Sequence, residues 1–279
     1  MPRDTSRAFL HQRKGTHMEV LIAATAEEAA TFAAEAVLDG LRSRRSGDNV
    51  LGVATGSTPL GLYAELAKAV ERGEADFSTT TAFALDEYVG LEGTHEQSYR
   101  QTLVTELCNV VGLPESRLNT PDGYGDSEAQ IRAQAAAYDA AIIEAGVDVQ
   151  ILGIGTNGHI GFNEPGSSLR SRTRIKRLST QTRVDNARFF EGPDAVPTHS
   201  VTQGLGTILE ARRMVLVATG SKKAAAIAAA LEGPLSAACP GSVLQLHPDA
   251  VVVLDEAAAA GLKNRSYYDD SAAGLQFGI

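Results

Sequence analysis

Five glycines punctuate one segment of the chain, Gly153-Ile154-Gly155-Thr156-Asn157-Gly158-His159-Ile160-Gly161-Phe162-Asn163-Glu164-Pro165-Gly166. It follows an apolar run, Val147 to Leu152, that indicates a buried strand. Open α/β sheets bind ligands at the carboxyl ends of their strands, and glycine lets a backbone approach a ligand closely. His159 and Glu164 add a proton carrier and a carboxylate. We therefore expect an active-site loop here.

Further apolar runs on both sides of this loop predict strands. They span Glu19 to Ala23, Asn49 to Ala54, Thr81 to Leu85, Met214 to Ala218, Val243 to Leu246 and Val251 to Leu254. Helical patterns lie between them: from Thr25 to about Ser43, from Thr58, near Ser98 to Leu107, Ser127 to Ala145, near Leu205 to Glu210, and up to Leu231. Strands alternating with helices predict a doubly wound, mostly parallel open sheet with helices on both faces, a Rossmann-like α/β fold.

Two helix starts carry specific signals. Thr25-Ala26-Glu27-Glu28 is a capping box. Thr58 is a typical N-cap residue, and Pro59 follows it at the first helical position.

The sequence before Thr58, Val53-Ala54-Thr55-Gly56-Ser57, recurs as Val217-Ala218-Thr219-Gly220-Ser221. Free amides at such strand-to-helix turns bind anions, although glycine-serine turns are also common without a ligand. Two copies and a following lysine pair favour a phosphate.

The composition limits the class of partner. The chain has 279 residues, is 43% hydrophobic and carries a formal net charge of −9, which argues against nucleic acid or a membrane surface as a partner and favours a small-molecule substrate. The two cysteines, Cys108 and Cys239, show no disulfide or zinc pattern. No apolar run reaches the ~18 residues of a membrane span, and the amino terminus lacks the apolar core of a signal peptide. We expect a cytoplasmic protein.

Residues 1–17 are polar and precede a second methionine, Met18, so we expect a disordered extension, with Met1 and Met18 both open as the start. Residues 18–279 should form a single α/β domain.

Between about residues 169 and 197 the hydrophobic periodicity is poor, and we expect a lid. That segment carries seven cations: Arg170, Arg172, Arg174, Lys176, Arg177, Arg183 and Arg188. They form either a solvated face or a positive surface that steers an anionic substrate.

Other chemistries fit the residues less well. The Gly153-x-Gly155-x-x-Gly158 spacing matches a dinucleotide fingerprint, but no helix follows and no acid stands about 20 positions on. The histidines show no metal-ligand spacing, so neither a metal nor a cofactor is expected. A lone histidine is usually a core residue, but glycines flank His159 and a carboxylate follows. Asp86, at the end of the predicted Thr81 to Leu85 strand, is a helix cap or a general base.

Several motifs together resemble one family, that of the glucosamine-6-phosphate deaminases. They are Thr55 to Pro59, Phe83 to Leu91, Gly153 to Pro165, Ser171 to Lys176 and Leu244 to Pro248, and the resemblance spans Met18 to about Tyr268. It implies a hydrolase or isomerase of amino-sugar (N-acetylglucosamine) catabolism that converts glucosamine 6-phosphate and water into fructose 6-phosphate and ammonia. The lactonase 6-phosphogluconolactonase and a catalytically inactive sugar-phosphate-sensing domain are the alternatives; the loop does not match the lactonase pattern, and 17 residues are too few for a DNA-binding helix-turn-helix.

The resemblance also assigns residues. His159, oriented by Glu164, would move the proton that opens the sugar ring, and Asp86 would move a proton between carbons 2 and 1. Asn157 stands where some relatives have aspartate, which implies a lower His159 pKa here than in those relatives. The phosphate would contact Gly56, Ser57, Thr58, Arg188 and Lys223.

Regulation stays open at this stage. Some relatives are hexamers that N-acetylglucosamine 6-phosphate activates, through positions resembling Ser167, Arg174 and Lys176 and a neighbouring subunit's terminal amine. Other relatives are monomers. An extension before Met18 would displace that amine, so both a regulated homo-oligomer and an unregulated monomer fit the sequence.

Overall fold

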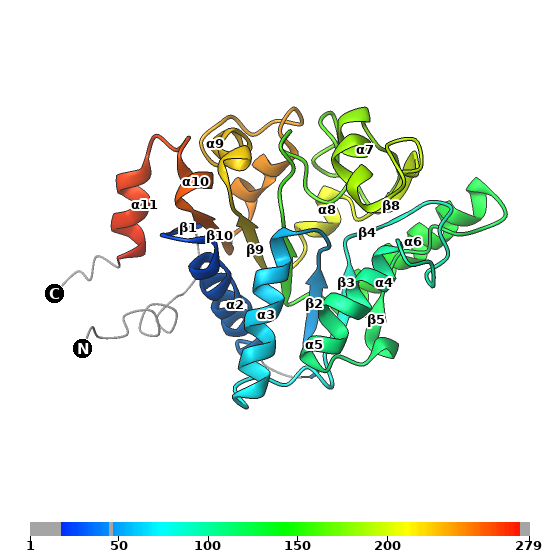
Figure 1. Cartoon of the computed structure of the whole chain (residues 1–279), viewed down its shortest axis with the longest axis horizontal. Helices are drawn as coiled ribbons and strands as arrows, with labels where there is room; N and C mark the ends of the chain where they lie inside the picture. Colours follow the sequence, from blue (N-terminus) through cyan, green and yellow to red (C-terminus); the bar gives the residue numbers. More distant parts are fainter. Residues whose placement is uncertain (1–17, 45–46, 274–279) are drawn as a thin grey trace.

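The computed structural model describes residues 18–44 and 47–273, so the predicted extension over residues 1–17 lies outside it. Its centre is a seven-stranded sheet in the order β1-β10-β9-β6-β2-β3-β5 with every neighbouring pair parallel (Figure 1). The strands are β1 (Glu19–Ala23), β2 (Val50–Val53), β3 (Thr81–Ala84), β5 (Leu118–Asn119), β6 (Val149–Leu152), β9 (Arg213–Ala218) and β10 (Ala250–Asp255). The predicted open parallel sheet is confirmed.

Helices surround this sheet. They are α2 (Ala26–Arg42), α3 (Thr58–Glu71), α4 (Tyr99–Leu103), α5 (Asn109–Val111), α6 (Glu128–Ala145), α7 (Thr180–Asn186), α8 (Leu205–Ile208), α9 (Ala224–Leu231), α10 (Glu256–Ala259) and α11 (Arg265–Ala272). The capping box at α2 is confirmed, because the Glu28 N–H donates to Thr25 Oγ1 at 3.1 Å and the Glu28 carboxylate accepts from the Ala24 N–H at 2.7 Å. In the described part of the chain, none of the helices is long and apolar enough to cross a membrane.

The strands that the sequence predicted best are buried along their whole length. Every residue of β2, β6, β9 and β10 is buried. A parallel strand covered on both faces reads as a continuous apolar run, which is why these four were recognisable.

A second, smaller sheet was not predicted. It is antiparallel, in the order β4-β8-β7, and consists of β4 (Asp86–Tyr88), β8 (His199–Thr202) and β7 (Arg174–Arg177). Asp86 therefore begins β4 instead of closing the preceding strand. The predicted irregular segment 169–197 contains β7 and α7. Strand β7 is half-exposed and carries three cations, so it lacks the apolar signature of a strand.

Two local predictions were wrong, and one predicted helix changes its type along its length. Val243 to Leu246 lies in a 3₁₀ helix, Pro240–Leu246, whose buried side chains give the same apolar run as a strand. The residue before α3 is Ser57, not Thr58, and its side chain makes no capping hydrogen bond. The helix predicted from Ser98 passes from α4 into a π-helical turn, Val104–Cys108, before α5.

Candidate functional site

The glycine-rich loop leaves the sheet where its strand order reverses. From β2 the chain continues to β3 and β5 on one side, whereas β6 is followed by β9 and β10 on the other. Ligands bind α/β sheets at such switch points, beyond the carboxyl ends of the strands. The loop, which begins at Gly153 directly after β6, occupies that position.

His159 lies over the backbone of Gly155. A Cβ atom added to Gly155 would be 2.3 Å from the imidazole, so only glycine leaves room for this ring. The ring is largely buried, and its Nδ1 is 3.9 Å from Glu164 Oε2 without a hydrogen-bond partner. Burial lowers the His159 pKa, although the Glu164 carboxylate opposes the effect. The imidazole is therefore neutral at pH 7 and can accept a proton.

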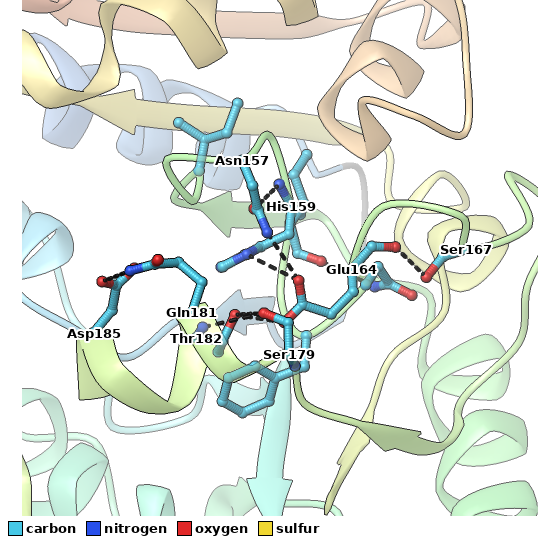
Figure 2. A network of polar contacts seen from close by, with 12 residues as sticks. Asn157, His159, Glu164, Ser167, Ser179, Gln181, Thr182 and Asp185 are labelled. Atoms are coloured by element: carbon cyan, nitrogen blue, oxygen red, sulfur yellow. Dashed lines mark hydrogen bonds and ion pairs between the residues drawn. The ribbon is translucent and has the colours of Figure 1, made fainter. Parts of the chain in front are cut away.

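Glu164 is the centre of the polar network in Figure 2. Its carboxylate accepts from Asn157 Nδ2 at 2.9 Å, from the Ser179 N–H at 3.1 Å and from the Thr182 hydroxyl. Burial alone would raise the Glu164 pKa, but the donors at Thr182, Ser179 and Asn157 and the nearby His159 outweigh it and hold the pKa below its ordinary value. Glu164 is thus a fixed negative charge beside the imidazole.

Asn157 holds two parts of the loop together. Its Nδ2 contacts Glu164, and its Oδ1 accepts from the His159 backbone N–H at 3.2 Å. The amide therefore orients the residue that carries the imidazole through the main chain, and it occupies the Glu164 oxygen nearest to Nδ1. The expected pKa difference from aspartate-bearing relatives stays a prediction.

Asp86 reaches the same loop from β4. A Cβ atom added to Gly161 would be 3.3 Å from Asp86 Oδ2, and the Phe162 N–H acts on this carboxylate as a hydrogen-bond donor. Asp86 is 6% exposed. Burial, reinforced by the negative charge of Glu87, raises the Asp86 pKa to about 8. The carboxyl group is thus largely protonated at pH 7, and it lies beside Gly161, two residues after His159 in the loop.

The neighbouring acid, Glu87, has a structural role. Its carboxylate accepts from the backbone N–H groups of Tyr99 and Arg100, each at 2.9 Å, and so caps the first turn of α4. Its negative charge also contributes to the raised pKa of Asp86.

The predicted phosphate residues flank the loop. Gly56 has a φ of +96°, and α3 begins after it with no side-chain cap, which leaves amides of its first turn for an anion. From the other side, Lys223 Nζ donates to the Ile154 carbonyl at 2.6 Å. Burial lowers the Lys223 pKa, and Arg188 lowers it further, so these two cations act on each other. Ser57 and Arg188 are exposed.

The second copy of the turn differs from the first. The Gly220 N–H donates to both carboxylate oxygens of Asp255, at 3.0 Å each. The Asp255 carboxylate therefore takes the place of an anion at this second turn. What the turn contributes to the site is the side chain of Lys223.

The three effector positions differ in what their side chains contact. The Ser167 hydroxyl is buried and donates to the Glu164 carbonyl at 2.7 Å, and Arg174 donates to Asn163 Oδ1 at 2.9 Å. Lys176 lines a cavity of about 420 Å³ with Arg177 and Arg183.

Not all of the seven cations are available for steering. Arg172 pairs with Asp139 and Glu210, and Arg183 donates to backbone carbonyls. Arg172 therefore fastens the segment to the rest of the chain, whereas Arg183 links two parts of the segment itself.

Sequence reasoning missed three contributors. Helix α7 supplies Thr182, which holds Glu164, and Asp185, whose charge raises the pKa of both His159 and Lys223 (Figure 2). Strand β8 supplies Thr202, which accepts from the Phe162 N–H at 3.1 Å. The one available signal was Ser179, a typical N-cap residue followed three positions later by Thr182.

The chain is similar to known proteins over most of its length. A family described as glucosamine-6-phosphate isomerases and 6-phosphogluconolactonase matches residues 19–253. The glucosamine-6-phosphate deaminase of Rhodococcus opacus is 54% identical over 252 residues, which cover 90% of this chain and 95% of that protein. The deaminase of Streptomyces coelicolor is 53% identical over 253 residues, with the same coverage.

Two solved structures resemble this fold to different degrees. A monomeric glucosamine-6-phosphate deaminase superimposes with a TM-score of 0.82 at 38% identity, over 88% of this chain and all of that one. The 6-phosphogluconolactonase of Leishmania guyanensis gives 0.65 at 21% identity, over 87% of this chain and 98% of that one, a likeness of fold alone.

Proposed function

Because the chain belongs to the family of glucosamine-6-phosphate isomerases and 6-phosphogluconolactonases, we propose that it converts glucosamine 6-phosphate and water into fructose 6-phosphate and ammonia. The observation that carries this proposal is the buried carboxyl group of Asp86 against the loop that holds His159. The family description favours an isomerisation coupled to loss of ammonia over a simple hydrolysis. We place the reaction in the catabolism of N-acetylglucosamine, in the cytoplasm.

Ring opening is the task we assign to His159. The neutral imidazole takes the proton of the anomeric hydroxyl and delivers it to the ring oxygen, which breaks the bond between carbon 1 and that oxygen. During the transfer the imidazole is a cation, and Glu164, 3.9 Å away, stabilises it. Asn157 keeps the carboxylate in place through its contact at 2.9 Å.

Proton transfer between carbons is the task of Asp86. The carboxylate removes the proton of carbon 2, giving a cis-enolamine, and returns it to carbon 1, after which water adds to the carbon 2 imine and ammonia leaves. A base with a pKa of about 8 is largely protonated at pH 7. The ammonium group of the substrate, held nearby, favours the charged carboxylate and so switches the base on.

This dependence on a cation favours the deaminase over the lactonase alternative. A phosphogluconolactone carries no positive charge next to its reacting carbon, so it would leave the Asp86 carboxyl largely protonated at pH 7. We assign the phosphate of the substrate to Gly56, Ser57 and Thr58 at the start of α3, with Lys223 and Arg188 as counter-charges.

The direct test is to incubate the purified protein with glucosamine 6-phosphate and to follow ammonia and fructose 6-phosphate. Equal amounts of both products, formed without added metal or nucleotide, are expected. Release of neither product, or turnover of 6-phosphogluconolactone instead, would refute the proposal.

Lys223→Ala tests the phosphate site. It should raise KM for the sugar phosphate about 10- to 100-fold, as expected for the loss of a charge-assisted hydrogen bond. Lys222→Ala is the matched control, because Lys222 is the exposed neighbour in the same turn. Equal changes in both variants would contradict the assignment.

We also propose that the segment around residues 169–197 acts as a lid, that residues 18–279 form one domain and that the chain acts without an effector. Ser167 and Arg174 are committed to internal contacts, which supports the last point. Velocity against substrate should be hyperbolic and unchanged by N-acetylglucosamine 6-phosphate, whether the chain is a monomer or an oligomer. A sigmoidal curve that the acetylated sugar makes hyperbolic would contradict it.

A further inference from the structure

Asp86 has a direct neighbour across the small sheet. Strand β4 lies beside β8 (Figure 1), and in the register of this pair Asp86 stands opposite Thr202. The Gln203 N–H donates to the Leu85 carbonyl and the Val89 N–H to the His199 carbonyl. These bonds alternate along an antiparallel pair, so Asp86 and Thr202 form a non-hydrogen-bonded pair, in which side chains on one face are closest.

The glycine-rich loop lies against the side chains of both Asp86 and Thr202. A Cβ atom added to Gly161 would be 3.0 Å from Thr202 Oγ1 and 3.3 Å from Asp86 Oδ2. The next residue, Phe162, directs its N–H to Thr202 Oγ1 at 3.1 Å, and the same N–H acts on the Asp86 carboxylate. The hydroxyl and the carboxylate therefore converge on a single donor.

The hydroxyl proton of Thr202 has only a weak partner. It points to the Gln203 carbonyl over 3.3 Å, which is long for an O–H···O hydrogen bond. Thr202 is 0% exposed, so water does not offer an alternative. A carboxylate next to it would be a much stronger acceptor, because charge-assisted O–H···O⁻ bonds are short and strong.

We propose that Thr202 is a positioning residue for Asp86: its hydroxyl turns from the Gln203 carbonyl to the Asp86 carboxylate when that group becomes charged, while Phe162 continues to donate to Thr202. The chain of donors then runs from the loop through the hydroxyl to the base. It favours the charged base and fixes the oxygen that faces carbon 2. This inference rests on the proposed role of Asp86 in deamination.

Other groups around Asp86 do not substitute for this donor. Glu87 and Tyr88 come from β4 itself, Tyr99 from α4 and Tyr138 from α6. The charge of Glu87 raises the pKa of Asp86, and the charge of Asp86 in turn raises the pKa of the three tyrosines. The hydroxyl of Tyr88 is engaged with Tyr99 and Asn186, and that of Tyr138 with two backbone carbonyls. His159 and Glu164 lie elsewhere on the loop. Thr202 is the polar side chain that β8 places opposite the carboxylate.

The test compares Thr202→Val with Thr202→Ser. Valine removes the hydroxyl at nearly constant volume, whereas serine keeps it and loses only the methyl group. The acidic limb of kcat/KM should move up by about one pH unit in the valine variant, because a hydrogen bond to the charged form shifts a carboxyl pKa by about that amount. At pH 7 this is a roughly tenfold loss, which disappears well above the limb, and the serine variant should follow the wild-type profile. Coincident wild-type and valine profiles, or equal shifts in both variants, would overturn the proposal.

A second measurement does not need activity. The pH range over which unfolding free energy falls reports the ionisation of the buried Asp86, so in the valine variant it should extend about one pH unit higher than in the serine variant. A shift in a protein without deaminase activity would reject the proposed function and keep the pairing of Thr202 with Asp86. Normal activity without either shift would reject the pairing alone.

Discussion

Replacing Asp86 by asparagine should abolish turnover and stabilise the protein at the same time. The substitution keeps the shape of the side chain and removes its charge. A general base typically contributes about 10²- to 10⁴-fold to rate, so kcat should fall by that factor while the substrate still binds.

The stability gain follows from the raised pKa of Asp86. Its ordinary value of 3.8 applies in the unfolded chain, and burial raises it to about 8 in the folded protein. Between these two pH values the unfolded chain releases a proton that the folded protein keeps, so wild-type stability falls as pH rises. The loss is about 1.4 kcal/mol per pH unit and reaches on the order of 5 kcal/mol above pH 8. Asparagine has no such loss.

The assay is urea unfolding of both proteins at pH 4 to 9. The difference in unfolding free energy, variant minus wild type, should be small near pH 4, grow through the neutral range and level off above pH 8. A constant difference would show that the carboxyl group is solvated in the native protein. Retained turnover in a folded variant would show that Asp86 is not the base.

Two further substitutions test the loop. Gly155→Ala should lower kcat at least a hundredfold, because the added Cβ would lie 2.3 Å from the His159 imidazole and displace it, whereas Gly153→Ala meets nothing within 4 Å and should be as active as wild type. Equal kcat values for the two variants would contradict the packing of the ring on Gly155. Asn157→Asp places a second carboxylate beside the Glu164 oxygen that the amide contacts at 2.9 Å, so the imidazolium is favoured and the acidic limb that reports His159 should move to higher pH. Identical acidic limbs in the two pH-rate profiles would rule this out.

The sequence predicted the large sheet because its strands are buried on both faces. It did not predict the small sheet, because β7 and β8 lack the continuous apolar run of a buried parallel strand. Three of the four residues of β7, Arg174–Arg177, are cations and none of the four is buried, and β8 pairs with β4 only through contacts distant in the chain. Asp86 was recognised as a candidate, but as the end of a strand instead of the first residue of another.

The same reasoning explains which parts of the site were visible. His159, Asn157 and Glu164 lie within one loop, so their spacing alone predicted that they meet, and their contacts run along that loop.

Thr182 and Thr202 join the site only through the fold. Thr182 meets Glu164 from 18 positions away, and Thr202 meets Phe162 from 40. Hydroxyls of this kind have no sequence pattern of their own, because a single threonine occurs in strands and at helix caps without any role at a site. Yet Thr182 lowers the pKa of Glu164 by donating to its carboxylate, and we propose the same role for Thr202 at Asp86. One loop therefore supplies His159 and Glu164, whereas the small sheet supplies Asp86 and α7 supplies a hydroxyl donor to Glu164.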